Sequence, residues 1–439
     1  MKHNKNIIIA NWAGVNTGDD AIFTVLLNIV SQNISNDASI YVLADNDKLI
    51  KSKYNINDAI RIFDFYKLHN LKKLFRFLRA SHLVIYGGGD IISGNIESIS
   101  FIALALIVGL PVMCCGVGVI PIKSPLKRFF TKFVLNRVTS ITVRDEESKQ
   151  RLDLMRVIKP KVIVTSDLAF LLSPNPNCDE ILQKIRIDKT KLKIGVCIRP
   201  FSSMYDFYGF WRDKLLIKDI GVMCDYLTER FDATIIFIPM VIKERTKYYH
   251  KNLEADDELC NRIINSMTNK GRVILLKEDY TPNEVIWILN QMQLVIAARL
   301  HALLLGALGE VPVIAIEYAP KIKSFMTSIN RSNYSININE LSQKKLKETI
   351  DQALKEKDVI NSNRLKSNIV KAKMNANEIE KMIEIAIKKR FRLYLFLPAT
   401  IIIALLNYLY SAVQIVLKKK YFRNIIRDVN ENNFSSSKD

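Results

Sequence analysis

The alternation of short β-branched runs with longer helical patterns is the feature that most constrains the fold of this 439-residue chain. Parallel strands need long crossover connections, usually helical, so this alternation is typical of parallel sheets covered by helices. We predict strands at residues 6–10, 39–44, 83–86, 111–115, 140–143 and 161–164 in the first half, and at 193–198, 233–239, 272–276, 294–297 and 311–316 in the second. The sequence therefore predicts an α/β chain.

A proline-containing break divides this pattern in two. Pro174 and Pro176 lie among serine and asparagine residues, which is typical of a boundary between two folded units. We expect two Rossmann-like lobes, at 1–175 and 176–335, followed by a helical return segment at 336–390, an apolar membrane-associating helix at 391–423 and a polar tail at 424–439. Open parallel sheets bind ligands beyond the carboxyl ends of their strands, so a cleft between the lobes is the predicted site.

The positive charge of the chain indicates an anionic partner. The 64 Lys and Arg residues exceed the 44 Asp and Glu residues by 20, and much of this excess lies beyond residue 340. Basic clusters flank the uncharged residues 393–417, a pattern that favours an anionic membrane surface, contacted through 388–423, over nucleic acid. That stretch fits three structures, namely a helix in the membrane plane, a spanning helix, or a buried helix in the core or between subunits. The oligomeric state stays open.

The six cysteines favour a reducing compartment. They are scattered without a CxxC pair, and several lie inside apolar runs, so we expect reduced thiols in a cytoplasmic protein. The N-terminus offers four apolar residues, 7–10, which is too few for a signal-peptide core. We therefore expect the protein in the cytoplasm, associated with the inner face of the cell membrane.

Glycine-rich turns follow three of the predicted strands. The first, at 14–21, contains Asn16, Gly18 and Asp19; the second includes Gly88 and Gly89; the third covers 116–118. Closely spaced glycines let a ligand or another chain segment approach the backbone. The candidates for lining the cleft or contacting an acceptor are Asn16, Gly18, Asp19, Gly88 and Gly89. An ordinary strand-to-helix turn with an Asp cap is the alternative for the first one. The GxGxxG dinucleotide pattern does not occur.

Charged residues follow the other predicted strands. Arg144 could fork onto a phosphate or carboxylate in the cleft, or pair with the acids next to it. Asp167 could contact an acceptor or merely cap a turn. Arg299 and His301 are expected at the start of a helix, with Lys321 on a loop opposite. A purely structural role for His301 is the alternative, although burying these cations together without an anion is costly.

These motifs together resemble those of the polysaccharide pyruvyl transferase family. The resemblance spans about residues 7–330 and rests on the segments at 16–21, 87–89, 143–145, 166–170, 238–240, 299–302 and 318–321. It implies a two-lobe fold similar to GT-B glycosyltransferases, and transfer of pyruvate from phosphoenolpyruvate to two hydroxyls of one sugar as a cyclic ketal. The family's functional arginine, histidine and lysine correspond to Arg144, His301 and Lys321, with Arg299 at the neighbouring arginine position.

The chemistry of these side chains agrees with that reaction. Arg144, Arg299 and Lys321 offer forked and point cations for the carboxylate and phosphate of phosphoenolpyruvate. His301 could supply or relay a proton to the methylene carbon, and the scheme requires neither a metal nor a cofactor. The saccharide acceptor is expected in cell-surface glycan synthesis and could be linked to a lipid. The alternatives are a nucleotide-sugar glycosyltransferase on the same fold and a catalytically inactive membrane-surface scaffold.

Overall fold

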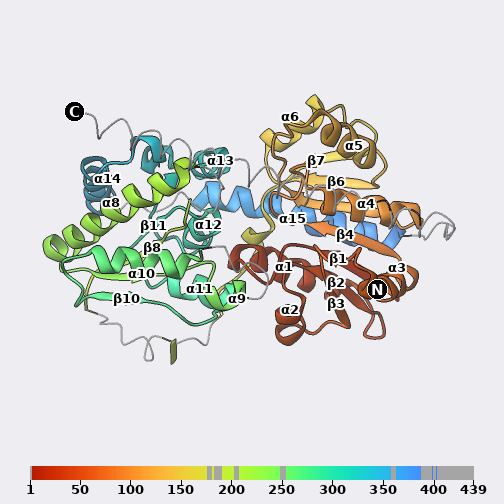
Figure 1. Cartoon of the computed structure of the whole chain (residues 1–439), viewed down its shortest axis with the longest axis horizontal. Coiled ribbons are helices and arrows are strands. Elements are labelled where there is room, and N and C mark those ends of the chain that lie inside the picture. The colour runs from red at the N-terminus through yellow and green to blue at the C-terminus, as the bar shows by residue number, and fades with distance from the viewer. Residues whose placement is uncertain are drawn as a thin grey trace, which may run out of the picture.

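The computed structural model contains two parallel β-sheets that lie side by side, each with helices packed on it (Figure 1). It describes residues 2–175, 180–181, 190–201, 207–247, 254–356 and 362–386, with the single residues 398 and 402. The first sheet has the order β3-β2-β1-β4-β5-β6-β7 and the second the order β10-β9-β8-β11-β12-β13. This arrangement confirms the predicted α/β class.

The N-terminal sheet is made of seven strands and is covered by helices on both faces. Its strands are β1 (Ile7–Ala10), β2 (Ile40–Ala44), β3 (Asp58–Arg61), β4 (Leu83–Gly87), β5 (Val112–Val117), β6 (Ser140–Val143) and β7 (Lys161–Val164). Its helices are α1 (Thr17–Asn33), α2 (Asp47–Lys53), α3 (Leu68–Ala80), α4 (Ile96–Ile107), α5 (Pro125–Leu135) and α6 (Glu146–Leu154), and the short 3₁₀ helix η1 (Leu168–Leu171) follows β7.

The C-terminal sheet repeats this architecture with six strands. Its strands are β8 (Lys193–Cys197), β9 (Thr234–Phe237), β10 (Val273–Leu275), β11 (Leu294–Ala297), β12 (Val313–Glu317) and β13 (Ser335–Asn337). The helices of this part are α8 (Phe207–Phe231), α9 (Lys243–Thr246), α10 (Asp256–Ser266), α11 (Pro282–Leu289), α12 (Leu300–Leu308), α13 (Pro320–Ser328) and α14 (Gln343–Glu356).

The β-branched composition of the central strands follows from their burial on both faces. In β1, Ile7 and Ile9 enter one hydrophobic core while Ile8 and Ala10 enter the core on the opposite face of the sheet. Side chains alternate between the two faces of a strand, so a strand covered on both sides needs apolar residues at every position. Five cysteines belong to these cores as free, buried thiols: Cys114, Cys115, Cys197, Cys224 and Cys260.

Two strands and one helix position differ from the sequence prediction. The prediction lacks β3 and β13, because Asp58–Arg61 and Ser335–Asn337 do not have the apolar run of a buried strand and lie at sheet edges. It places Lys321 on a loop, whereas Lys321 is the second residue of α13, which Pro320 begins. Proline is favoured at the first position of a helix, and this signal could have placed Lys321 correctly.

A long C-terminal helix, α15 (Ser362–Ile385), returns to the N-terminal lobe and packs on α1, η1 and β5 (Figure 1). Asn375 on this helix is fully buried. Its side-chain oxygen accepts a hydrogen bond from Thr142 Oγ1 at 2.5 Å, and its amide group donates one to the Ser166 carbonyl at 2.9 Å. The helix is therefore anchored to the ends of β6 and β7 by buried polar contacts.

The predicted membrane-associating helix at 391–423 and the polar tail at 424–439 lie outside the described residues, apart from positions 398 and 402. Among the residues that the structure does describe, no helix combines the length and the hydropathy needed to cross a bilayer.

Candidate active site

The two lobes meet where the carboxyl ends of their strands face each other. The Thr17 amide at the start of α1 donates a hydrogen bond to the Met240 carbonyl of the second lobe at 2.9 Å. Nearby, Arg245 lies almost fully buried and binds Asp20 of α1 at 2.7 Å and also Asp279. A buried ion pair that spans the lobes fixes the N-terminus of α1 against the second lobe, because either charge alone would be costly to bury.

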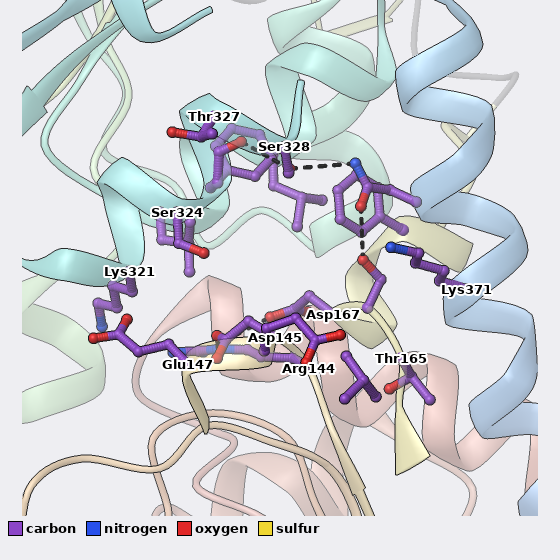
Figure 2. Close-up of a pocket in the computed structure, with 18 residues that line it drawn as sticks. Arg144, Asp145, Glu147, Thr165, Asp167, Lys321, Ser324, Thr327, Ser328 and Lys371 are labelled. Carbon is purple, nitrogen blue, oxygen red and sulfur yellow. Dashed lines mark hydrogen bonds and ion pairs between the residues drawn. The ribbon is translucent and has the colours of Figure 1, made fainter. Parts of the chain in front are cut away.

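A pocket of about 270 Å³ lies beside this junction (Figure 2). Arg144, Asp145, Thr165 and Asp167 line it from the first lobe, together with residues of α12, α13 and α15. Figure 2 shows Lys321 and Arg144 on the same side of the pocket, with Lys371 of α15 at its far end. Basic side chains therefore reach this pocket from both lobes and from the returning helix, while Phe170, Leu304 and Phe325 give it apolar walls.

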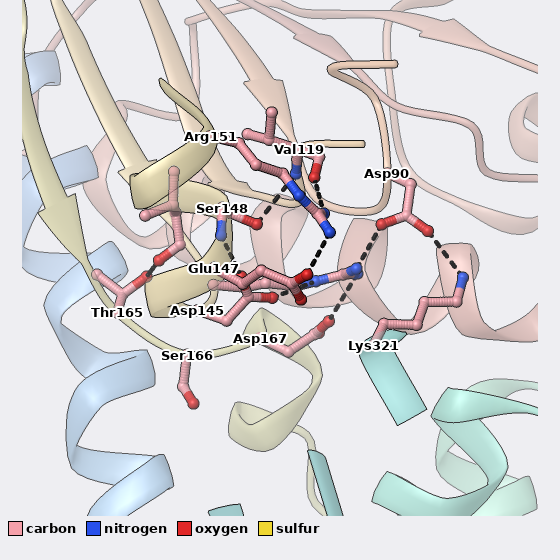
Figure 3. A network of polar contacts seen from close by, with 12 residues as sticks. Asp90, Val119, Asp145, Glu147, Ser148, Arg151, Thr165, Ser166, Asp167 and Lys321 are labelled. Atoms are coloured by element: carbon pink, nitrogen blue, oxygen red, sulfur yellow. Dashed lines mark hydrogen bonds and ion pairs between the residues drawn. The ribbon is translucent and has the colours of Figure 1, made fainter. Parts of the chain in front are cut away.

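Asp90 joins the cations of the two lobes. Its Oδ2 atom accepts a hydrogen bond from Lys321 Nζ at 2.7 Å, and its Oδ1 atom accepts one from the Arg144 guanidinium. Figure 3 shows Asp90 and Lys321 facing each other across the cleft. Burial alone would raise the pKa of Asp90, but the charges of Arg144 and Lys321 hold that pKa well below its ordinary value. Asp90 is therefore ionised and balances one cation from each lobe.

His301 lies on the other side of Arg144. It is the second residue of α12, and its Nε2 atom lies 3.5 Å from Asp167 Oδ2, which in turn lies 3.9 Å from Arg144 Nη1. Burial raises the pKa of Asp167, but His301 and Arg144 lower it by more. His301 Nε2 and Asp167 Oδ2 are both buried and have no hydrogen-bond partner among the described residues. The two atoms lie 3.5 Å from each other, so they form an ion pair when His301 is protonated, and buried polar atoms are rarely left without such a partner.

The glycine-bearing turn before α1 contacts His301 directly. A Cβ atom on Gly18 would lie 2.1 Å from His301 Nδ1, so only glycine leaves room for the imidazole. Asn16 caps the helix by accepting a hydrogen bond from the Gly18 amide at 3.0 Å, and its side-chain amide donates to Asp19 Oδ2 at 3.0 Å. The turn therefore caps a helix, as the structural alternative predicts, and it also packs against His301, while contact with an acceptor stays a prediction.

Asp19 and the glycines after β4 complete this wall. Gly88 and Gly89 both have φ near +71°, which L side chains rarely adopt, and a Cβ atom on Gly89 would lie 3.2 Å from Asp19 Oδ1. Burial is the main reason that the pKa of Asp19 is raised to about 6, and the nearby charge of His301 opposes this shift. Asp19 therefore exchanges a proton close to neutral pH, as acid–base groups in active sites do.

Arg299 forms an ion pair with Asp256, and this carboxylate differs from the one that binds Arg144 and Lys321. Its Nε atom donates a hydrogen bond to Asp256 Oδ2 at 3.0 Å, and a second nitrogen contacts Asp256 Oδ1, so the pair is bidentate. The same fully buried carboxylate accepts the Met240 and Val241 amides at 3.1 Å each. Arg299 therefore links the start of α12 to the segment after β9, next to the contact between the lobes.

Three residues of the site, Asp90, Arg199 and Tyr318, are absent from the predicted set of site residues. Asp90 follows the glycine run after β4, and Arg199 follows β8; both positions could have been found by their place at a strand end. Arg199 Nη1 donates a hydrogen bond to the Tyr318 hydroxyl at 2.9 Å. Burial raises the pKa of Tyr318, but Lys321, Arg199 and Arg299 lower it by more.

Within the described residues, no group of His, Cys, Asp or Glu side chains is arranged to hold a metal ion.

A family model for polysaccharide pyruvyl transferases matches residues 16–320, which is most of the chain. The chain belongs to this family. The match includes Arg144, His301 and the residues that contact them in the cleft, and it ends one residue before Lys321. No curated protein sequence matches the chain.

Solved structures with a similar fold are two-lobe enzymes of nucleotide-sugar chemistry. UDP-GlcNAc 2-epimerase from Methanocaldococcus jannaschii is 13% identical, with a TM-score of 0.58 over 87% of this chain and 100% of that one. The Neisseria meningitidis UDP-GlcNAc 2-epimerase is 12% identical, with a TM-score of 0.57 over 88% and 100%. At this identity the likeness establishes the GT-B-like fold alone, and the activity of a pyruvyl transferase family member must be argued from its own site.

Proposed function

We propose that this protein transfers the pyruvyl group of phosphoenolpyruvate to two hydroxyls of one sugar and forms a cyclic ketal in the synthesis of a cell-surface polysaccharide. The observation that supports this most directly is the meeting of Arg144 and Lys321, one from each lobe, at Asp90, with His301 beside them. Together with the family membership, it supports the cleft between the lobes as the place of the proposed reaction.

The cations of the cleft suit the two anionic groups of the donor. Arg144 can fork onto a carboxylate or phosphate, and Lys321 can neutralise a phosphate oxygen as a point charge. Both now bond Asp90, so donor binding requires that substrate oxygens replace this carboxylate or join it. Arg299 is bound by Asp256, so its charge is balanced and we assign it a positioning role at the N-terminus of α12, where the helix dipole itself favours an anion.

The reaction begins with proton transfer to the methylene carbon of phosphoenolpyruvate, which gives the neighbouring carbon cationic character. One sugar hydroxyl then forms a C–O bond to that carbon and releases its proton. The bond from carbon to the phosphate oxygen breaks, phosphate leaves, and the second hydroxyl closes the ring as it loses its own proton. The products are the ketal and phosphate, so one hydroxyl proton replaces the proton used at carbon and the other leaves with phosphate or solvent.

His301 and Asp19 are the groups placed to move these protons. We assign His301 as the proton donor, because it lies beside Arg144 and Asp167 at the start of α12, and the Asp167 carboxylate, 3.5 Å from Nε2, can stabilise the imidazolium. Asp19, with a pKa raised to about 6, is assigned as the acceptor of a hydroxyl proton. Asn16 donates a hydrogen bond to Asp19 and Gly89 lies next to its carboxylate, and together with Gly18 and Gly88 they would shape the acceptor side of the cleft.

The acceptor would be a saccharide, carried in one version of the proposal on a lipid. The basic and apolar segment 388–423 would then hold the enzyme on the cytoplasmic face of an anionic membrane, near such precursors.

The test incubates the purified protein with phosphoenolpyruvate and candidate saccharides, and measures phosphate release and the mass of the saccharide. Phosphate should appear only with an acceptor that gains a pyruvyl ketal. His301→Ala should lower turnover by about 10²- to 10⁴-fold, the usual effect of removing a general acid or base. Arg144→Ala and Lys321→Ala should weaken donor binding, whereas Lys323→Ala, an exposed lysine on the same helix as Lys321, should not. Consumption of a nucleotide sugar with unchanged phosphoenolpyruvate would contradict the proposal.

A further inference from the structure

An apolar stripe on helix α5 faces solvent. Leu126, Phe129, Phe130 and Phe133 are 77%, 66%, 36% and 48% exposed. Their spacing follows the helical repeat, so at 100° per residue they lie within an arc of about 100° on one side of the helix. A different face, carrying Thr131, Val134 and Leu135, packs on the core. A helix that already buries one apolar face does not need a second one for folding, so this stripe calls for a partner.

The charged side chains of the segment that carries this stripe are all basic. Residues 123–137 contain five Lys or Arg residues and neither Asp nor Glu. The loop after α6 extends the surface, because the Ile158 and Lys159 amides both donate hydrogen bonds to Asn136 at the end of α5, at 3.0 Å each. Ile158 is 79% exposed, and residues 154–161 add three basic residues without an acidic one. We call residues 123–137 with 154–161 the α5 surface.

We infer that the α5 surface docks on an anionic lipid bilayer. Aromatic and aliphatic side chains on one face of a helix with lysine and arginine at its borders are typical of helices that lie in a membrane interface. Anionic headgroups complement the eight positive charges, whereas a second copy of this chain would bring eight further positive charges against them. A membrane therefore fits this surface better than self-association does.

The α5 surface lies close to the active site along the chain. Gly118 borders Asp90 and Arg144, since a Cβ atom at this position would lie 2.6 and 2.7 Å from them. Seven residues later the chain enters α5 at Pro125, a distance of at most about 25 Å for an extended chain. In Figure 1, α5 and α6 lie together on the outer side of the first lobe. Docking would therefore bring the cleft near the bilayer, which, if the proposed function holds, supplies a lipid-linked acceptor.

The first test reads contact between the α5 surface and lipid directly. Full-length protein with Phe133→Trp is mixed with vesicles of phosphatidylcholine and about one-third phosphatidylglycerol, some containing brominated lipid as a fluorescence quencher. The new tryptophan should be quenched beyond the background of the parent protein. Leu215→Trp, at a 61% exposed position on α8 of the other lobe, is the matched control and should add no quenching. Equal quenching in the two variants, or no quenching of the Phe133→Trp protein above that of the parent, overturns the proposal.

The second test measures binding. The triple change Leu126→Gln, Phe129→Gln and Phe133→Gln should weaken co-sedimentation with the same vesicles by about tenfold, because apolar contact with the interface is lost. Leu215→Gln should stay within about twofold, and both variants should keep the melting temperature of the parent, since the changed side chains are exposed. Segment 388–423 is present in every protein, so its contribution is constant. Unchanged binding by the triple variant overturns the proposal.

Analytical ultracentrifugation without lipid covers the remaining case. If the parent protein self-associates and the triple variant does not, the α5 surface is a contact between copies and the membrane proposal is wrong. None of these assays contains donor or acceptor, so their outcomes are independent of the pyruvyl transfer proposed above.

Discussion

The contact between Gly18 and His301 gives the sharpest prediction from this structure. Gly18→Ala adds one methyl group, and by helix propensity alone it should stabilise α1 by up to about 1 kcal/mol. In place, however, the new Cβ atom would lie 2.1 Å from His301 Nδ1, 2.5 Å from Cγ and 2.7 Å from Cβ of that histidine. The last of these atoms is close to the backbone, so a side-chain rotation alone cannot relieve the clash.

The size of the effect follows from these distances. Non-bonded carbon atoms approach to about 3.5 Å, so the imidazole and the start of α12 must move by more than about 1 Å. Overpacking of this kind typically costs about 1–3 kcal/mol, which exceeds the gain in helix propensity, so the net change should destabilise the protein by about 1–2 kcal/mol. A displacement of about 1 Å at a catalytic group costs about 10²-fold in rate. We therefore expect both losses together.

Two measurements check this reasoning. Urea unfolding gives the stability, and phosphate release from phosphoenolpyruvate with an acceptor gives the rate. Gly271→Ala is the matched control, because no atom lies within 4 Å of its added Cβ. In the double variant Gly18→Ala with His301→Ala the contacts with Nδ1 and Cγ disappear and only the 2.7 Å contact with Cβ remains, so the double variant should lose less stability than the two single variants lose in sum. A Gly18→Ala protein with parental stability and a rate within threefold would show that the two residues are not in contact.

Three further predictions concern buried polar groups. Asp19→Asn should become more stable relative to the parent as pH rises from about 4 to 6. In the parent, Asp19 ionises near pH 3.8 when unfolded but only near pH 6 when folded, so the parent loses up to about 3 kcal/mol of its unfolding free energy over this range and the Asn variant does not. Urea unfolding at several pH values measures the difference. Arg245→Met should destabilise by about 3–5 kcal/mol, because it leaves Asp20 buried without a counter-charge, whereas Asp20→Asn in the same background should restore part of the loss. Asn375→Leu should cost about 2 kcal/mol in denaturant unfolding through the unpaired Thr142 and Ser166 groups, and a loss under about 0.5 kcal/mol would show that α15 does not depend on them.

The architecture of the lobes could be predicted because their central strands are buried on both faces. Such strands must be apolar at nearly every position, which makes them visible in the sequence, as in the run 7–10. The edge strands β3 and β13 need apolar residues at only some positions, and Asp58 and Arg61 in β3 give no such signal. Helix α8 begins at Phe207, and the mixed composition of its first turns hides the helical periodicity from the sequence.

The members of the site could be predicted in part, but their partners could not. Strand ends and glycine turns indicate Arg144, Asp167 and His301 because position along a parallel sheet determines which residues face the cleft. The pairing of Arg144 and Lys321 on Asp90 depends on how two separately folded sheets are placed against each other, and no local pattern encodes that. The exposure of the apolar stripe on α5 could not be predicted either, because its residues have the same spacing as the buried face of an ordinary amphipathic helix.

The charge balance of the cleft determines how an anionic donor can enter it. Asp90 remains ionised at neutral pH because two cations lower its pKa, so under the proposed function the phosphate of the donor would compete with it for Arg144 and Lys321. Asp19 lies in the electrostatic range of Asp90, Lys321 and His301, and its pKa of about 6 is already near neutrality. A further negative charge beside it raises that pKa, so donor binding favours protonated Asp19. In the proposed reaction Asp19 would then be a poor base until phosphate has left the cleft, which would place deprotonation of the second hydroxyl after phosphate release.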